Sequence, residues 1–352
     1  MTFARVILWP FSLLYGLVTA VRNKCYDWGW LPSIRFDDVE VVCVGNITTG
    51  GTGKTPHVEY LIRTLSPHCR LAVLSRGYKR KTKGFVLATT ASTAQDVGDE
   101  PCQIKRKYQD IPVAVDTDRR RGIRQLKTLY PSLQIILLDD AFQHRRVTPS
   151  FSFLLADYRR PLYRDGMLPG GRLREWTCFA RRADVLIITK SPENISTEER
   201  ENLRRKYASI FSGEILFSII RYETPAPVFQ NVPPLDETRL ARAHVLLLTG
   251  IAHPQPLEDH VHRLSACMQA VTFGDHHRYT PSDIDAIMKK WEQWADMDEK
   301  YVLTTEKDAM RLQMTDIPDS LQKALFYIPV KVEFLEGQAP EKRINRKYRE
   351  SL

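Results

Sequence analysis

Apolar runs alternate with stretches of helix length along the first two thirds of the sequence. Each run is short, continuous and rich in Val, Ile and Leu, which is typical of strands buried on both faces of a parallel sheet. The intervening stretches are long enough to form helices that cover such a sheet. We therefore expect an α/β fold with a mostly parallel sheet and helices on both faces. The runs are Val41–Val44, Leu71–Leu74, Ile111–Val115, Leu133–Leu138 and Val185–Ile188.

Clustered prolines interrupt this pattern between Thr224 and Pro234. We interpret this segment as a linker. Beyond it, further apolar runs and two helical stretches predict a second, smaller α/β domain. The expected domains are residues 1–224 and 225–352. The runs of the second domain are Val245–Leu248, Val271–Phe273, Tyr301–Thr304 and Phe326–Val330, and its helical stretches are Pro281–Ala295 and Glu306–Leu312.

A different pattern occupies the N-terminal region, where Val6–Val21 contains no charged residue. This stretch is shorter than the roughly 20 residues that a helix needs to cross a bilayer, and Pro10 and Gly16 interrupt it. Basic residues follow it and several Trp and Tyr side chains lie nearby, as in helices at a membrane interface. We therefore expect a membrane-associated segment at about residues 1–32, on the cytoplasmic side. A core helix and a spanning or cleaved segment are the alternatives.

The 352-residue chain carries a formal net charge of +9, much of it in clusters of Lys and Arg. Such clusters suit phosphate-bearing partners, whether a nucleotide, a nucleic acid or an anionic lipid surface. A solvated face explains any single cluster about as well. No nucleic-acid recognition motif accompanies them, so we expect no nucleic-acid partner. The clusters include Lys79–Lys81, Arg119–Arg121, Arg145–Arg146 and Arg159–Arg160.

A glycine-rich segment ending in Gly-Lys-Thr directly follows the first apolar run. It matches the phosphate-loop pattern G-x-x-x-x-G-K-[ST], except that Thr48 stands at the first glycine. The order of strand, loop and helix places backbone N–H groups at a helix N-terminus, beside Lys54 and the Thr55 hydroxyl. A glycine-rich hairpin is the alternative, but it leaves the lysine and the hydroxyl unexplained. We expect a nucleoside triphosphate and Mg²⁺ to bind at Thr48, Thr49, Gly50, Gly51, Thr52, Gly53, Lys54 and Thr55.

Carboxylates follow at two further places. Asp139 and Asp140 end an apolar strand, where an acid can face nucleotide-bound Mg²⁺, although capping of the next turn is the alternative. Asp99 lies in the short loop Gly98–Pro101, and its position before a predicted helix is typical of an N-cap. A kinase also needs a carboxylate that accepts the proton of the attacking hydroxyl, which makes Asp99 a candidate general base.

Two other segments gather polar residues. Leu168–Glu175 offers Arg172 and Arg174 for phosphate oxygens and Glu175 for a metal, with a surface ion-pair cluster as the alternative. Near the end of a predicted strand, His276 and His277 lack a third ligand at metal spacing, so we do not expect a zinc site there. A histidine that assists a base fits better.

At single positions, this chain differs from the sequence patterns of two other classes of nucleotide-binding protein. Membrane-associated partition ATPases carry a lysine just before the glycine pair of the loop, and this chain has Thr49 there. A GTPase should offer an Asn/Thr-Lys-x-Asp sequence that reads guanine. Thr189-Lys190-Ser191-Pro192 begins in that way but lacks the aspartate.

The ordered combination of these motifs resembles one family, tetraacyldisaccharide 4'-kinase, the lipid A 4'-kinase of Gram-negative bacteria. The resemblance extends to about Leu312, and Thr48 is normal in that family. The basic region beyond matches no motif. The motifs are Gly45–Thr48, Gly50–Pro56, Leu74–Tyr78, Gly98–Pro101, Asp139–His144, Leu168–Glu175 and Thr304–Ala309.

The resemblance implies transfer of the ATP γ-phosphate to the 4'-hydroxyl of an acylated glucosamine disaccharide 1-phosphate, giving lipid IVA. This would occur at the cytoplasmic face of the inner membrane, on the phospholipid surface, with no obligate protein partner. A partition or switch ATPase that acts at the membrane through a protein partner is the alternative. The resemblance implies that Lys54 contacts the transferred phosphate and that Mg²⁺ is bound by Thr55, Asp139, Asp140 and Glu175. It implies Asp99 as the base, paired with His276 when the domains close. The implied substrate or phosphate contacts are Arg76, Tyr78, Arg172 and Arg174.

Overall fold

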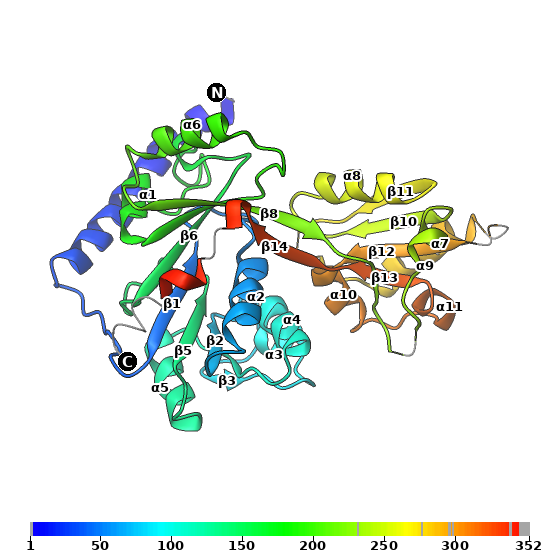
Figure 1. Cartoon of the computed structure of the whole chain (residues 1–352), viewed down its shortest axis with the longest axis horizontal. Coiled ribbons are helices and arrows are strands. Elements are labelled where there is room, and N and C mark those ends of the chain that lie inside the picture. Colours follow the sequence, from blue (N-terminus) through cyan, green and yellow to red (C-terminus); the bar gives the residue numbers. More distant parts are fainter. Residues whose placement is uncertain are drawn as a thin grey trace. The chain divides into compact units, whose positions relative to one another are not determined.

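The computed structural model describes residues 3–230, 232–275, 277–294, 297, 299–337 and 340–344. The chain forms two compact α/β units (Figure 1). The first unit comprises Met1–Thr90, Ile104–Ile220 and Val332–Leu352, and the second comprises Ala91–Gln103 and Arg221–Lys331.

A nine-stranded sheet forms the centre of the first unit, in the order β14-β8-β7-β6-β1-β5-β2-β4-β3. The pairs from β8 through β4 are parallel, and the short β3 pairs antiparallel with β4. Every residue of β5 is buried, and because successive side chains point to opposite faces, both faces of the sheet are covered. The strands are β1 Glu40–Gly45, β2 Leu71–Ser75, β3 Val86–Leu87, β4 Val113–Val115, β5 Ile135–Asp139, β6 Phe151–Asp157, β7 Val185–Thr189, β8 Glu214–Tyr222 and β14 Val330–Phe334.

The expected apolar runs of the first domain form β1, β2, β4, β5 and β7, which confirms the predicted fold class. Four further strands, β3, β6, β8 and β14, were not predicted, although β6 and β8 are rich in buried apolar residues. The helices of this unit are α1 Phe3–Asp27, α2 Lys54–Leu65, α5 Arg119–Leu129 and α6 Thr197–Tyr207, with 3₁₀ turns η1 Leu162–Arg164, η2 Thr177–Arg182 and η3 Leu335–Gly337.

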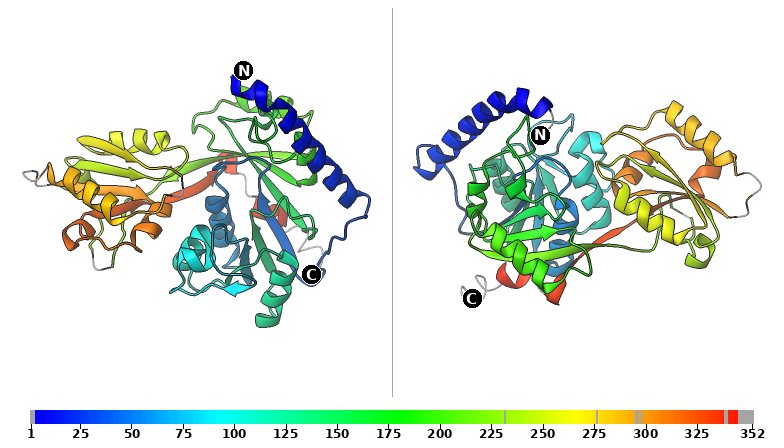
Figure 2. Two further views of the ribbon diagram at one scale, coloured as in Figure 1. Left: turned by 180° about the vertical axis from the view of Figure 1, so that it is seen from behind. Right: turned by 90° about the horizontal axis from the view of Figure 1, so that it is seen from above.

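Helix α1 is longer and more continuous than the sequence suggested. It runs through both Pro10 and Gly16 as one helix along the outside of the first unit (Figure 2). Gly16 has a packing role, because a Cβ there would come within 2.7 Å of the Trp176 ring. No helix among the described residues is both long and apolar enough to span a membrane.

The second unit has a five-stranded sheet in the order β11-β10-β12-β13-β9, parallel except for β9. Separate clusters of buried side chains lie on its two faces, which confirms a second, smaller α/β domain. Its strands are β9 Ala226–Pro227, β10 His244–Thr249, β11 Cys267–Thr272, β12 Lys300–Thr305 and β13 Leu325–Ile328, and its helices are α3 Ala94–Val97, the first half of α4 Asp99–Lys107, α7 Glu237–Leu240, α8 Gln255–Leu264, α9 Pro281–Glu292, α10 Glu306–Leu312 and α11 Asp319–Gln322.

The observed units differ from the expected consecutive division in two segments. Residues 91–103 belong to the second unit, where Glu100 forms an ion pair with Lys307 at 2.9 Å. The C-terminal segment from Val332 belongs to the first unit, where Tyr60 donates a hydrogen bond of 2.9 Å to Glu341. These partners lie far apart in the sequence, so the proline cluster alone did not locate the boundaries.

Candidate active site

The glycines of the loop between β1 and α2 allow backbone conformations that other residues rarely adopt. Gly50 and Gly53 adopt left-handed backbone conformations, with φ of 102° and 83°. A Cβ at Gly50 or Gly51 would meet no atom within 4 Å, so this part of the loop faces open space. The loop ends at Lys54, the first residue of α2. Backbone N–H groups at a helix N-terminus attract anions, so the geometry fits a phosphate group.

The first half of the loop is fixed by backbone pairing with the segment around Leu173. The N–H of Thr49 donates to the Arg172 carbonyl at 2.8 Å, and the N–H of Arg174 donates to the Ile47 carbonyl at 2.7 Å. Asn46 is fully buried, and its amide donates to the Thr52 hydroxyl at 2.8 Å. The sequence analysis identified both segments separately, and the structure brings them together.

Asp139 and Asp140 follow at the carboxyl end of β5, beside β1. Asp139 is buried, whereas Asp140 is partly exposed and has a φ of 49°. The Lys54 ammonium lies 3.6 Å from Asp140 Oδ2, and the Arg174 guanidinium lies 3.3 Å from Asp140 Oδ1. Burial opposes the charged form, but the two cations outweigh it and lower the pKa of Asp140. The Asp140 carboxylate is therefore ionised at neutral pH, as a metal ligand must be.

Arg119 is a residue of this site that the sequence analysis named only as part of a basic cluster. It is 2% exposed at the start of α5 and donates to the Asp116 carbonyl at 2.9 Å. Burial lowers the pKa of Arg119 to about 10, while Asp139 and Asp140 oppose this change. Arg119 therefore remains a buried cation next to the two acids. Its surface neighbours Arg120 and Arg121 pair with Asp118 and Asp116.

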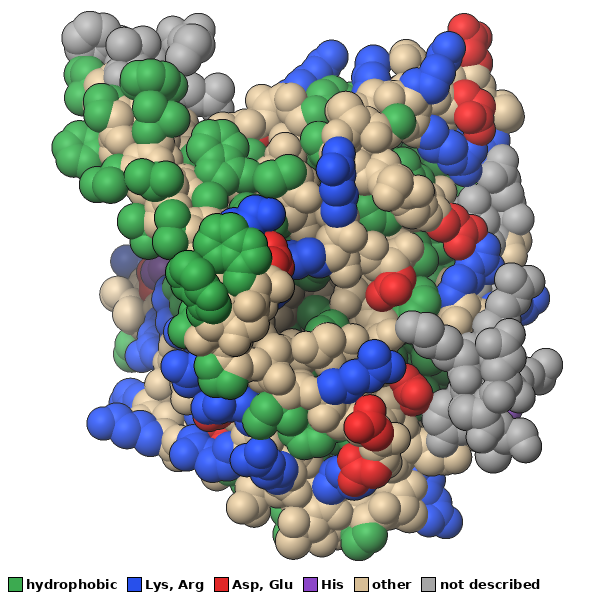
Figure 3. All heavy atoms as spheres, turned by 90° about the vertical axis from the view of Figure 1, so that its left-hand side faces the viewer, with side chains coloured by type: hydrophobic (Ala, Val, Ile, Leu, Met, Phe, Trp, Pro, Cys, Tyr) green, Lys and Arg blue, Asp and Glu red, His purple; other side chains and the backbone are tan. Residues whose placement is uncertain are grey.

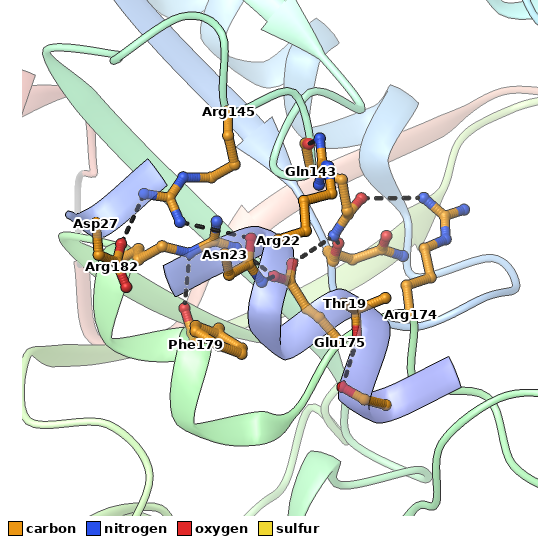
Figure 4. Close-up of polar contacts among 12 residues, drawn as sticks. Thr19, Arg22, Asn23, Asp27, Gln143, Arg145, Arg174, Glu175, Phe179 and Arg182 are labelled. Atoms are coloured by element: carbon orange, nitrogen blue, oxygen red, sulfur yellow. Dashed lines mark hydrogen bonds and ion pairs between the residues drawn. The ribbon is translucent and has the colours of Figure 1, made fainter. Parts of the chain in front are cut away.

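Glu175 is buried and held by three side chains, and its role as a metal ligand stays a prediction. Its Oε2 accepts hydrogen bonds from Asn23 Nδ2 at 2.8 Å and Arg182 Nη2 at 2.7 Å, and its Oε1 accepts one from Gln143 Nε2 at 2.8 Å (Figure 4). Among the residues that the structure describes, no three Asp, Glu, His or Cys side chains gather closely enough to hold one metal ion. Glu175 links α1 and η2 to Gln143, which also donates to the Asn46 carbonyl at 2.7 Å.

The remaining expected substrate contacts differ in exposure. Arg174 is partly buried and contacts both Asp140 and the Gln143 side chain, the latter at 3.3 Å. Arg172 is exposed, as are Arg76 and Tyr78 just after β2. Because β2 neighbours β5, its carboxyl end lies at the same edge of the sheet as Asp139. Their roles as substrate contacts stay predictions.

Asp99 begins α4 and belongs to the second unit, where a buried arginine holds it. Arg311 donates to Asp99 Oδ2 from Nη2 at 2.7 Å and from Nε at 3.2 Å. Arg311 also donates to Asp308 Oδ1 at 2.8 Å, and Asp308 is fully buried. The Asp99 carboxylate is thus oriented by a fixed partner and keeps about a fifth of its side chain exposed.

The expected partner of Asp99, His276, lies outside the described residues. Its neighbour His277 contacts Asp283 Oδ2 through Nε2 at 3.0 Å and stacks on Phe273. Asp99 belongs to the same unit as residues 221–331, and the sequence analysis expected it in the other domain. The expected pairing of Asp99 with His276 stays a prediction.

A cationic cavity of about 560 Å³ lies between the end of α1 and the loop after Asp140. Two of its arginines already have acidic partners, since Arg145 pairs with Asp27 and Arg120 pairs with Asp118, at 2.8 and 2.7 Å. His144 Nε2 is buried and has no hydrogen-bond partner among the described residues. Burial lowers the pKa of His144 to about 4. The cavity is lined by Arg22, Tyr26, Leu31, Pro32, Arg120, His144, Arg145 and Arg146.

Helix α1 presents one face to the protein and an apolar face to solvent. Ser12, Gly16 and Asn23 lie on the inner face, where Asn23 is 1% exposed and the Trp176 indole donates to the Gly16 carbonyl at 2.9 Å. Figure 3 shows apolar side chains gathered on the opposite side. We define the apolar face of α1 as Ile7, Trp9, Phe11, Leu13, Leu14, Leu17, Val18 and Val21, and Trp28, Trp30 and Leu31 continue it.

A family model described as tetraacyldisaccharide-1-P 4'-kinase matches residues 4–349. The chain belongs to this family. A tetraacyldisaccharide 4'-kinase from Parabacteroides distasonis is 44% identical over 93% of this chain and 90% of the relative. One from Bacteroides thetaiotaomicron is 40% identical over 94% of this chain and 89% of the relative. Family membership confirms the expected ATP-dependent lipid sugar kinase of lipid A biosynthesis.

The fold of this kinase also matches a solved structure. The apo-form LpxK from Aquifex aeolicus, crystallised in complex with ATP, superposes with a TM-score of 0.75 at 26% sequence identity. The match covers 98% of each chain. It confirms the predicted phosphate-loop α/β architecture over the whole length of the kinase.

Proposed function

We propose that this kinase transfers the γ-phosphate of ATP to the 4'-hydroxyl of a tetraacylated disaccharide 1-phosphate, giving lipid IVA. The observation that carries the proposal is the ion pair of Lys54 with Asp140 at the end of the phosphate loop, 3.6 Å apart. It brings a cation for the transferred phosphate and an ionised acid for a metal to one place. Phosphoryl transfer needs chiefly such positioning and charge neutralisation.

Mg²⁺ fits the oxygen-rich end of β5. This ion is usually held by one or two carboxylates together with substrate phosphates and waters. Thr55, Asp139 and Asp140 would supply the protein oxygens, and Arg119 and Arg174 balance the charge of the two acids. When bound, the ion neutralises charge on the phosphates. Glu175 already accepts hydrogen bonds from Asn23, Gln143 and Arg182, and its remaining acceptor capacity could serve the same ion.

Asp99 remains our proposed general base. A base must be held in a fixed orientation and must be reachable by the hydroxyl that loses its proton. Arg311 fixes the orientation of the carboxylate, and the side chain is partly exposed. Asp308 in turn fixes Arg311, so the group that orients the base is itself buried and paired.

The cationic cavity supports an acceptor that carries its own phosphate. Arg22 of α1 and Arg146 of the loop after Asp140 both line the cavity, and His144 Nε2 would gain a partner from a bound anion. The apolar side chains that follow α1 adjoin this cavity through Leu31. We therefore place the 1-phosphate of the acceptor in the cavity, with the acyl chains left in the lipid phase.

One assay tests both the reaction and the cavity. The purified kinase is incubated with γ-labelled ATP, Mg²⁺ and either the tetraacylated disaccharide 1-phosphate or the same lipid without its 1-phosphate. We expect label in both lipids and a KM about tenfold higher for the second, because the cavity loses a charge-assisted contact. Label found only as free phosphate would refute the kinase function. Equal KM values would refute the cavity assignment and leave the kinase function standing.

We further propose that the apolar face of α1 rests on the cytoplasmic surface of the inner membrane. Leu14 is 61% and Trp30 is 72% exposed, and an apolar strip of this size is unusual on a soluble surface. A lipid surface is the occupant that fits, because the acceptor carries acyl chains that strongly disfavour leaving the bilayer. Arg22 and Lys24 at the end of the strip suit anionic headgroups.

The double substitution Leu14→Gln and Leu17→Gln is expected to reduce binding to phosphatidylglycerol vesicles at least tenfold. Burying one Leu side chain contributes about 1.5–3 kcal/mol, and both residues point away from the protein. Co-sedimentation measures the change, and Tm should stay constant. Leu129→Gln serves as the control, since Leu129 is 51% exposed on α5 of the same unit. Vesicle binding that falls equally in the control would contradict the assignment of α1.

A further inference from the structure

Three consecutive carbonyl groups of the phosphate loop each accept a hydrogen bond from a side chain outside the loop. The Lys190 ammonium donates to the Gly51 carbonyl, and the Thr189 hydroxyl donates to the Thr52 carbonyl at 2.9 Å. His57 Nδ1 lies 2.7 Å from the Gly53 carbonyl. The half of the loop that the segment around Leu173 does not hold is therefore held by these three donors.

The first two donors come from the end of β7, two strands away from β1. Thr189 is the last residue of β7 and is fully buried. Lys190 follows with a φ of 56°, an uncommon left-handed conformation for a residue with a side chain. Its ammonium also pairs with Asp157 Oδ2 at the end of β6, at 2.9 Å. Parallel strands end at one edge of the sheet, which brings both residues to the loop.

The third donor, His57, lies in the first turn of α2. A carbonyl oxygen can only accept, so Nδ1 carries the proton and Nε2 accepts from the Ser218 hydroxyl of β8 at 2.9 Å. Burial lowers the pKa of His57 to about 4, against the opposing effect of the bond to Gly53. The imidazole is therefore neutral at physiological pH, and this tautomer is maintained by both partners.

These bonds control which way the loop peptides face. The C=O of one residue and the N–H of the next belong to one rigid plane and point in opposite directions. Holding the Thr52 and Gly53 carbonyls therefore directs the N–H groups of Gly53 and Lys54 to the other side. A carbonyl turned toward a triphosphate would repel it, whereas an N–H attracts it. A donor on the carbonyl also polarises the same peptide and strengthens its N–H as a donor.

We propose that Thr189 and Lys190 are positioning residues that, with His57, preorganise the phosphate loop for the triphosphate of ATP. The proposal explains why the chain has a Thr-Lys pair at the end of β7 although it lacks the aspartate of a guanine reader. Preorganised donors act without reorganisation when the ligand binds. The inference rests on the proposed binding of ATP at this loop.

Two matched pairs of variants test the proposal. Thr189→Val removes the hydroxyl at nearly constant volume, and Thr189→Ser keeps it. Lys190→Met removes the ammonium but keeps an apolar stem, and Lys190→Arg keeps a cationic donor. We expect the Val and Met variants to raise the KM for ATP about tenfold. The KM for the acceptor and kcat should change less than threefold, and the Ser and Arg variants should stay within about threefold of wild type in all constants.

Steady-state kinetics of the full-length kinase with both substrates gives these values, with Tm measured alongside. Equal KM values for ATP in the Val and Ser variants, and in the Met and Arg variants, would overturn the proposal. A loss shared equally by both substrates would also overturn it. Lys190 is partly exposed, so its pair gives a result even where Thr189→Val lowers stability. A wild-type kinase that shows no saturation with ATP would instead refute the proposed function.

Discussion

Replacing Lys54 with alanine is expected to lower kcat/KM for ATP by about a thousandfold or more. Lys54 is the first residue of α2, and its ammonium lies 3.6 Å from Asp140 in a mostly buried position. Removing one preorganised group that stabilises developing charge costs about 10²–10³ in kcat. The loss of a full positive charge beside the transferred phosphate should exceed that range, which corresponds to about 4 kcal/mol or more.

The loss is measured by steady-state phosphorylation of the acceptor at saturating Mg²⁺. Lys54→Arg should recover little, because a larger, planar guanidinium does not reproduce the position of a compact ammonium. Lys127→Ala is the control, since Lys127 pairs with Asp38 on the outside of the same unit. Turnover of Lys54→Ala within tenfold of wild type would show that the loop does not place Lys54 on the transferred phosphate.

The second large effect is expected for Asp99→Asn, which should lower kcat by about 10²–10⁴ and leave the KM for ATP nearly unchanged. General base catalysis contributes a factor of this size. Asparagine has the shape of aspartate and can still accept from Arg311, so the fold of the second unit should be preserved. The change therefore removes the basic oxygen and little else.

Two measurements separate a base from a structural carboxylate. The kcat of the wild type should fall at low pH as the base becomes protonated, and Asp99→Asn should lack that limb of the profile. Glu100→Gln is the matched control, because Glu100 is the next residue and pairs with Lys307 at 2.9 Å. An unchanged kcat together with a lowered Tm would assign Asp99 to the N-terminus of α4 as a structural group.

The roles of single charged residues were the least predictable part of the site. Glu175 follows two arginines in a flexible-looking segment, which favoured a metal ligand or a surface ion pair. In the structure it accepts a hydrogen bond from Asn23, 152 residues away, and is buried against α1. Arg119 lies in a run of three arginines, which is typical of an exposed basic surface, yet only 2% of Arg119 is exposed. Neither burial follows from neighbouring residues in the sequence.

The sequence by itself determined the α/β class, the phosphate loop and the family. Each of these depends on local order: a continuous apolar run, the glycines after it, and Lys54 and Thr55 at the start of a helix. The family is identified by several motifs that occur in one order along the chain, because the phosphate loop alone is not specific to it. Local patterns of this kind need no knowledge of which distant segments meet.

Only the tertiary structure decided which groups support the loop and how the chain divides. Thr189 and Lys190 reach the loop carbonyls because β7 ends at the same sheet edge as β1, and residues 91–103 join the second unit through pairs such as Asp99 with Arg311. Both depend on strand order and on contacts between residues more than 100 positions apart. Packing of the whole chain sets such contacts, and no local pattern records them.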